Sequence, residues 1–179
     1  MYELMHPVAS RRAISHLTSV IPTSGRRRVT AVAVPDSTLL ADALPRVDWS
    51  DAYAVSLPDG PAGHPQEWAD AVFASPPLWI GMLFGVREVV ARLAAIEPSD
   101  SHVFDTIASA EHEVLLGTDQ GHLSFRASIL LEPTRAVLST VVQVHNRRGR
   151  AYSLLVRRVH PVVVRTMLAR AAQQMEATS

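Results

Sequence analysis

The sequence predicts an α+β domain in which a curved antiparallel sheet wraps around a long C-terminal helix. Strand-like segments follow one another closely between residues 103 and 145, and their short connections favour antiparallel hairpins over crossovers. The chain then ends in an amphipathic segment that opens with Pro161, a favoured residue in the first turn of a helix. At 179 residues and 47% hydrophobic, the chain has the usual size of one domain with a substantial core.

Residues 1–36 are expected to form a basic arm with a short helix over 12–21 and a short β-branched strand over 29–34. Five arginines against the single acid Glu3 give residues 1–34 a net charge of +4, although the whole chain is neutral. The run Arg26-Arg27-Arg28 could attract nucleic-acid phosphate. Because no aromatic interleaving or nucleic-acid motif accompanies this run, we expect a solvated turn and no nucleic-acid partner.

Residues 37–179 are expected to form the domain itself. A short helix over Ser37–Leu44 is predicted first, with Asp36 or Ser37 as its N-cap. Bulky residues then alternate with small ones, which gives a strand one bulky face made of Trp49, Asp51, Tyr53, Val55 and Leu57. The turn Pro58-Asp59-Gly60-Pro61 ends this strand.

Two helices are predicted next, separated by Ser75-Pro76-Pro77. The first runs from Pro65 to about Ala74, and the second runs from Leu78 to Ala95 with an apolar stripe that should pack on a sheet. The strands that follow are Val103–Ser109, His112–Leu116, His122–Leu131 and Arg135–His145.

The C-terminal part is expected to hold one more strand and the last helix. Arg147-Arg148-Gly149 reads as a turn that leads into a strand near Ala151–Val156. The helix would begin at Pro161 and present a core face formed by Val163, Val164, Met167, Leu168 and Ala171.

Missing residue types exclude whole classes of chemistry. The chain has no cysteine, and all seventeen of its basic residues are arginine, so thiol nucleophiles, thiolate metal sites and lysine Schiff bases are excluded. No Gly-x-Gly-x-x-Gly fingerprint or helical His-x-x-x-His pair occurs, and we expect no cofactor and no metal. Without a long apolar run or a signal-peptide core, we also expect no membrane partner and a cytoplasmic location.

The strand His122–Leu131 carries the candidate catalytic residues, His122 and Arg126. They share one face of this strand with Ser124 and Ser128, whereas apolar side chains occupy the other face. If the polar face borders a cavity, arginine can hold an anionic group and histidine can move a proton near neutral pH. The alternative is that the polar face simply meets water.

Candidate ligand-binding residues are Trp79, Arg87, His145, Arg150 and Tyr152. Arg150 and Tyr152 would share a strand face and line one pocket with Trp79, which offers stacking and an anion fork. Taken alone, Trp79 is interpreted as a core residue in preference to a ligand platform. Asn146 is interpreted as a backbone cap, His160 as a neighbour of the helix N-terminus, and Glu111-His112-Glu113 as a hairpin rim.

The order of elements resembles the helix-grip fold of the START-like superfamily, which includes polyketide cyclases and lipid-transfer proteins. Three motifs in order are similar to the bacterial family called domain of unknown function 2867: Pro77-Leu78-Trp79-Ile80 with residues 83–87, Gly117-Thr118-Asp119-Gln120-Gly121 with residues 122–126, and Asn146-Arg147-Arg148-Gly149 running to His160. Ser124 departs from the acidic residue expected there, and residues 157–159 depart from a proline before His160. The resemblance implies the fold and no reaction.

These observations favour binding of a small hydrophobic or amphipathic molecule in an internal cavity. The alternative is a metal-independent acid–base enzyme, a cyclase, dehydratase or isomerase, that uses His122 and Arg126 in the same cavity. A second alternative is a structural or protein-interaction domain, and the composition is compatible with a homodimer.

Overall fold

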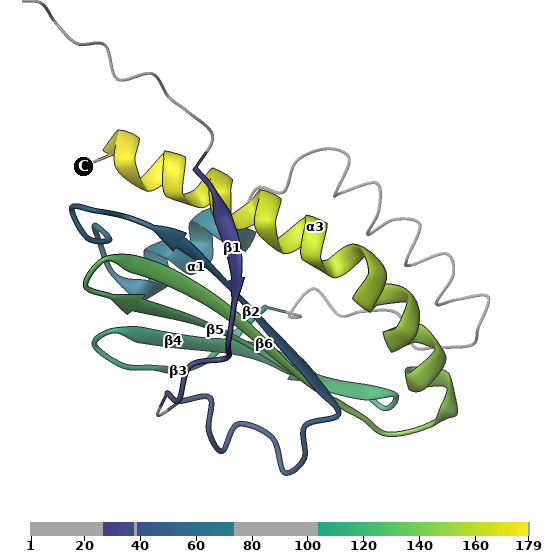
Figure 1. Cartoon of the computed structure of the whole chain (residues 1–179). Helices are drawn as coiled ribbons and strands as arrows, with labels where there is room; N and C mark the ends of the chain where they lie inside the picture. Colours follow the sequence, from purple (N-terminus) through teal and green to yellow (C-terminus); the bar gives the residue numbers. More distant parts are fainter. Residues whose placement is uncertain (1–26, 38, 74–103, 179) are drawn as a thin grey trace, which may run out of the picture.

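The computed structural model describes residues 27–37, 39–73 and 104–178 (Figure 1). In this part of the chain a six-stranded antiparallel sheet has the order β1-β2-β6-β5-β4-β3. The elements are β1 Val29–Val32, β2 Trp49–Ser56, α1 Pro65–Phe73, β3 Thr106–Ser109, β4 Glu113–Asp119, β5 Leu123–Glu132, β6 Arg135–Val144 and α3 Arg147–Thr178. The predicted α+β class is confirmed, and the arrangement is consistent with a helix grip.

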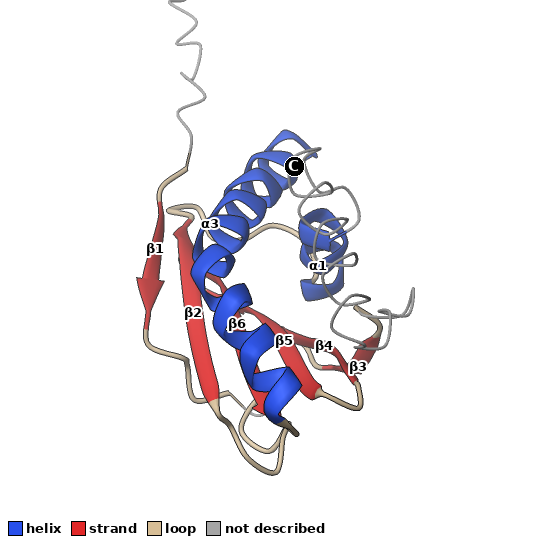
Figure 2. Cartoon of the chain, turned by 90° about the vertical axis from the view of Figure 1, so that its right-hand side faces the viewer, coloured by secondary structure: helices blue, strands red, loops and turns tan. Residues whose placement is uncertain are grey.

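The sheet curves beneath the helices α1 and α3, which lie side by side on its concave face (Figure 2). Strands β3 to β6 form a meander of consecutive antiparallel neighbours, as their short connections predict. Strand β2 extends the sheet beyond β6 and pairs with it along its whole length, from Trp49 opposite Val142 to Ser56 opposite Arg135. Strand β1, from the basic arm, adds to the outer edge of β2.

Side-chain alternation separates the two faces of the sheet. The concave face carries the main core, in which Val55, Val114, Ile129 and Leu168 are fully buried between the sheet and the helices. The convex face carries a smaller apolar cluster, where Leu40 and the other buried members Leu44, Leu115 and Val141 pack together. Residues 39–44 therefore cover part of the convex face rather than lying in solvent.

Helix α3 differs from the prediction at its beginning. The expected strand over Ala151–Val156 and the expected helix start at Pro161 are both wrong, because one helix runs from Arg147 to Thr178 and Pro161 lies inside it. The segment 151–156 is short and mainly apolar, and such a segment fits a strand or a buried helix segment equally well by period. A proline inside a helix removes one backbone donor and bends the helix, and α3 does bend as it follows the sheet (Figure 1).

The N-terminus of α3 is capped by Asn146, as its interpretation as a backbone cap predicts. Asn146 Oδ1 accepts a hydrogen bond from the Gly149 backbone N–H at 2.9 Å, and its Nδ2 donates to the Gly121 carbonyl at 3.0 Å. The same side chain therefore starts the helix and ties it to the turn before β5.

The predicted short helix over Ser37–Leu44 is also not observed, since the described residues there form turns, in which the Ala41 N–H donates to the Ser37 carbonyl and the Ala43 N–H to the Leu40 carbonyl. Ser37 Oγ does not cap a helix but donates to the buried carboxylate of Glu113 at 2.7 Å. Glu113 also accepts from Ser128 Oγ and from the Leu39 N–H at 3.2 Å. A satisfied buried carboxylate thus tethers this segment to the sheet, whereas a hairpin rim was expected at Glu113.

Two predicted helices, over 12–21 and 78–95, lie outside the described residues. Helix α1 agrees with the prediction over its described length, from Pro65 to Phe73. Neither α1 nor α3 combines the length and the hydropathy that a membrane-crossing helix needs.

Candidate functional site

A cavity of about 430 Å³ lies between α3 and the concave face of the sheet. Its described lining is dominated by aliphatic and aromatic side chains from α3, β2, β5, β6 and the flanks of α1 and β3. These residues are Trp49, Phe73, Phe104, Gln120, Leu123, Phe125, Ala127, Leu138, Thr140, Val142, Tyr152, Ser153, Leu155, Val156, Val159, His160, Val163, Val164 and Met167.

The sequence period of each element explains why these side chains meet. Along β5, Leu123, Phe125 and Ala127 alternate with polar residues and so all face the helix. Along α3, Tyr152, Val156 and the later lining residues recur every three or four positions, which keeps them on one helical face. Ala127 is small and lies in the middle of the concave wall, so it leaves room where a larger side chain would fill the space.

A polar cluster formed by Asp51, Thr140 and His160 lies at the edge of the cavity, and Thr140 and His160 belong to its lining. Asp51 and Thr140 are directly opposite each other on β2 and β6, and both point toward α3. His160 reaches them from α3: its Nε2 lies 3.2 Å from Asp51 Oδ1 and 3.3 Å from Thr140 Oγ1. The contact with Asp51 has ion-pair distance without the alignment of a hydrogen bond, so Oδ1 is buried with no aligned donor among the described residues.

Aromatic rings and arginines surround this cluster. Tyr53 donates a hydrogen bond to Asp51 Oδ2 at 3.3 Å, and burial raises the pKa of Tyr53, with the charge of Asp51 adding to the effect. The guanidinium of Arg165 lies 5.1 Å from the centre of the Tyr53 ring. Tyr53 therefore stays a neutral donor near pH 7 and holds one oxygen of Asp51 in place.

Trp49 forms the other flank of the cluster. Its ring meets His160 edge-on with a centroid separation of 5.4 Å, and its indole N–H donates to Ser153 Oγ at 2.6 Å. Arg157 lies over the Trp49 ring at 5.5 Å. Because Trp49 is anchored on β2 and its ring contacts three residues of α3, the indole forms a fixed apolar wall for the space next to His160.

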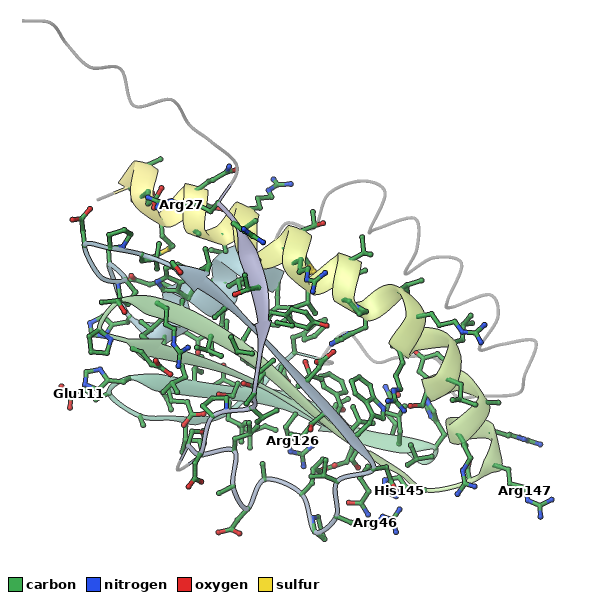
Figure 3. All side chains as sticks on the ribbon, in the orientation of Figure 1. Arg27, Arg46, Glu111, Arg126, His145 and Arg147 are labelled. Atoms are coloured by element: carbon green, nitrogen blue, oxygen red, sulfur yellow. The ribbon has the colours of Figure 1, made fainter. Side chains whose placement is uncertain are left out.

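The predicted catalytic residues, His122 and Arg126, do not line this cavity. Arg126 lies on the convex face, where it pairs with Asp119 at 3.0 Å and donates to the Phe125 carbonyl at 2.9 Å (Figure 3). His122 is buried in the turn before β5, with its ring edge-on to Tyr152 at 5.4 Å. The structure therefore separates the two residues rather than bringing them to one void.

The predicted ligand-binding residues are divided in the same way. Tyr152 lines the cavity, whereas Arg150 is exposed on α3. His145 is exposed beyond the end of β6, with its Nε2 2.9 Å from Ser124 Oγ on the convex side. Trp79 and Arg87 lie outside the described residues.

Sequence reasoning missed Asp51 and His160 as a pair. The alternation in β2 did place Asp51 on the bulky face, and a carboxylate within an otherwise apolar face was the available signal. His160 was assigned to a helix N-terminus because the helix was expected to start at Pro161. Across the described ranges, no group of three His, Asp or Glu side chains has the spacing of a metal site.

Comparison with known proteins gives one match. A family model described as "Protein of unknown function (DUF2867)" matches residues 43–167, a range that includes β2, the meander and the part of α3 that lines the cavity. No curated protein and no solved structure shows a significant match.

Proposed function

The chain belongs to the DUF2867 family, and because that description names no activity, we propose from the cavity itself that the protein binds a small hydrophobic or amphipathic molecule between α3 and the sheet. The observation that carries this proposal is the space of about 430 Å³ with a mainly apolar lining. Small-molecule sites are commonly concave, about 300 to 1,000 Å³ in size and apolar with a few polar groups. The shared arrangement of sheet and helix supports a further proposal, that this family is related to the START-like superfamily.

The lining combines a large apolar part with a few hydrogen-bonding groups, and this combination supports an amphipathic ligand. Phe125, Leu138 and Met167 offer only dispersion contacts and apolar surface, which would hold a hydrocarbon body. Thr140 on β6 and His160 on α3 add two hydrogen-bonding groups that lie 3.3 Å apart, which would fix the orientation of a single polar group. A ligand that also carries a polar group would gain a hydrogen bond at this pair.

A blocking substitution tests the proposal. N-phenyl-1-naphthylamine, an uncharged probe that fluoresces in apolar sites, should bind the native protein with saturation at one equivalent. Ala127→Phe places a ring in the middle of the cavity and should weaken probe binding at least about tenfold, which corresponds to about 1.4 kcal/mol. The matched control is Ala151→Phe, on an exposed position of α3, which should bind as the native protein does.

Thermal unfolding of all three proteins shows whether each variant is folded. Absence of saturable probe binding to the native protein would contradict the proposal. So would a folded Ala127→Phe variant that binds the probe as tightly as the native protein.

The Asp51–His160 contact favours a second candidate function, acid–base catalysis on the bound molecule. A histidine held by a carboxylate beside an apolar space is a common arrangement for proton transfer. This proposal replaces His122 with His160 as the proton-transferring group. To test this proposal, native mass spectrometry first identifies the molecule bound to the protein, and that molecule is then incubated with the protein in heavy water. Deuterium uptake into the molecule that His160→Gln abolishes supports catalysis, and binding without uptake rejects it.

A further inference from the structure

The ionisable groups of the cavity wall are few and unevenly placed. The described lining contains no Asp, Glu or Arg, and its titratable side chains are His160 and Tyr152. The nearest carboxylate, that of Asp51, is not part of the lining, because it lies behind His160 with Oδ1 buried and Oδ2 bonded to Tyr53. A ligand in the cavity therefore meets the imidazole and not the carboxylate.

The arginines near this cluster are directed to the aromatic rings. Arg157 lies over Trp49 and Arg165 lies over Tyr53, and neither arginine belongs to the lining. The described wall thus offers no guanidinium fork to an anionic head group. It offers instead the hydroxyl of Thr140 and the imidazole of His160, whose contact at 3.3 Å puts both groups at one place.

From this charge distribution, and resting on the proposed function, we infer that the ligand is an uncharged amphiphile whose hydroxyl or carbonyl oxygen binds at His160 and Thr140. A carboxylate would bring a second negative charge next to Asp51 in an apolar wall, and no arginine of the described lining would neutralise it. An ammonium group would lose its water without a carboxylate in the described lining, because Asp51 is not part of it and its Oδ1 already lies 3.2 Å from His160 Nε2. A neutral oxygen carries neither penalty.

Matched ten-carbon compounds test this inference in competition with bound N-phenyl-1-naphthylamine at one fixed pH near neutrality. Decan-1-ol and decan-2-one should displace the probe at concentrations at least about tenfold lower than decanoate or decylammonium, since burying an uncompensated charge costs more than burying a neutral oxygen. The four compounds share one chain length, so the head group is the variable.

Two variants connect this ranking to the residues that explain it. His160→Leu should weaken the alcohol and the ketone about fivefold to tenfold, because a hydrogen bond is lost, while the probe still binds. Asp51→Asn removes the negative charge behind His160 and should bring decanoate closer to the alcohol. Arg158→Gln, an exposed change on α3 outside the lining, should leave the ranking as it is in the native protein.

The outcomes separate the inference from the function on which it depends. If the probe does not bind the native protein, the proposed function fails. If the probe binds but decanoate or decylammonium competes as well as decan-1-ol, the cavity exists and the inference is overturned. A folded His160→Leu variant that binds decan-1-ol and decan-2-one as tightly as the native protein would also overturn it.

Discussion

Gly149→Ala should destabilise the protein although it puts a better helix-forming residue into α3. The backbone of Gly149 packs directly on the turn before β5, and a Cβ at this position would lie 2.0 Å from the His122 carbonyl oxygen and 2.9 Å from its carbonyl carbon. That oxygen already accepts a hydrogen bond from the His145 N–H at 3.0 Å. The obstacle is therefore backbone, which cannot rotate away as a flexible side chain can.

The magnitude follows from two opposing effects. Alanine in place of glycine inside a helix gains about 1 kcal/mol of folding free energy. To restore van der Waals distance, the first turn of α3 and the His122 turn must separate by more than about 1 Å, and such overpacking typically costs about 1 to 3 kcal/mol. Because the shift also strains the Asn146 cap, we expect a net loss of about 1 to 2 kcal/mol.

Urea unfolding followed by tryptophan fluorescence and circular dichroism measures this loss. In a domain of this size it corresponds to a fall in Tm of about 2 to 8 °C. The matched control is Ala151→Gly, an exposed position two residues along α3, where only helix propensity changes and a loss of about 1 kcal/mol is expected. A Gly149→Ala protein as stable as the native one, or more stable, would show that α3 does not pack on the His122 turn as described.

Three further predictions concern the same framework. Asn146→Ala removes the N-cap of α3 and should cost about 1 kcal/mol of unfolding free energy in urea, and an unchanged midpoint would contradict the capping role. Leu168→Ala empties a fully buried position and should cost about 2 to 5 kcal/mol, whereas Val162→Ala on the exposed side of α3 should change stability by less than about 1 kcal/mol. The hydrogen bond from Arg126 holds the pKa of Asp119 below its usual range, so this pair stabilises the fold above about pH 4 and the contribution is lost as pH falls further. Asp119→Asn should therefore flatten the acid side of the stability profile between about pH 5 and about pH 3, and parallel profiles for both proteins would refute the assignment.

The sheet was predictable because its signals are local. Alternation along β2 and β5, together with the short connections of the meander, indicates each strand and its inward face without knowledge of the rest of the fold. The start of α3 was not predictable by the same means. Residues 151–156 fit a strand or a helix by period, and Pro161 resembled a helix start although it lies within one.

The candidate site was harder to predict because it depends on where distant segments meet. The alternation in β2 gives the direction of Asp51, but its partner His160 is set by the register of β2 on β6 and by the rotation of α3, neither of which is encoded within one short window. The alternation in β5 places Ser124, Arg126 and Ser128 on the face opposite the cavity lining, whereas His122 lies in the turn before the strand. Because α3 packs against Leu123, Phe125 and Ala127, the polar face of β5 lies on the convex side of the sheet, away from the cavity.

The pairing of β2 with β6 has a consequence for the order in which the parts of the protein fold. Strands β3 to β6 and α3 are contiguous in sequence, whereas β2 must return across a much longer intervening stretch, and such long-range closure is slow and entropically costly. In a partly folded chain in which β2 is not yet paired with β6, Thr140 and His160 would be in place but Asp51 would not. A molecule that needs Asp51, Thr140 and His160 together would bind only the fully folded protein. By mass action its binding would stabilise the pairing of β2 with β6 and slow amide hydrogen exchange in β2.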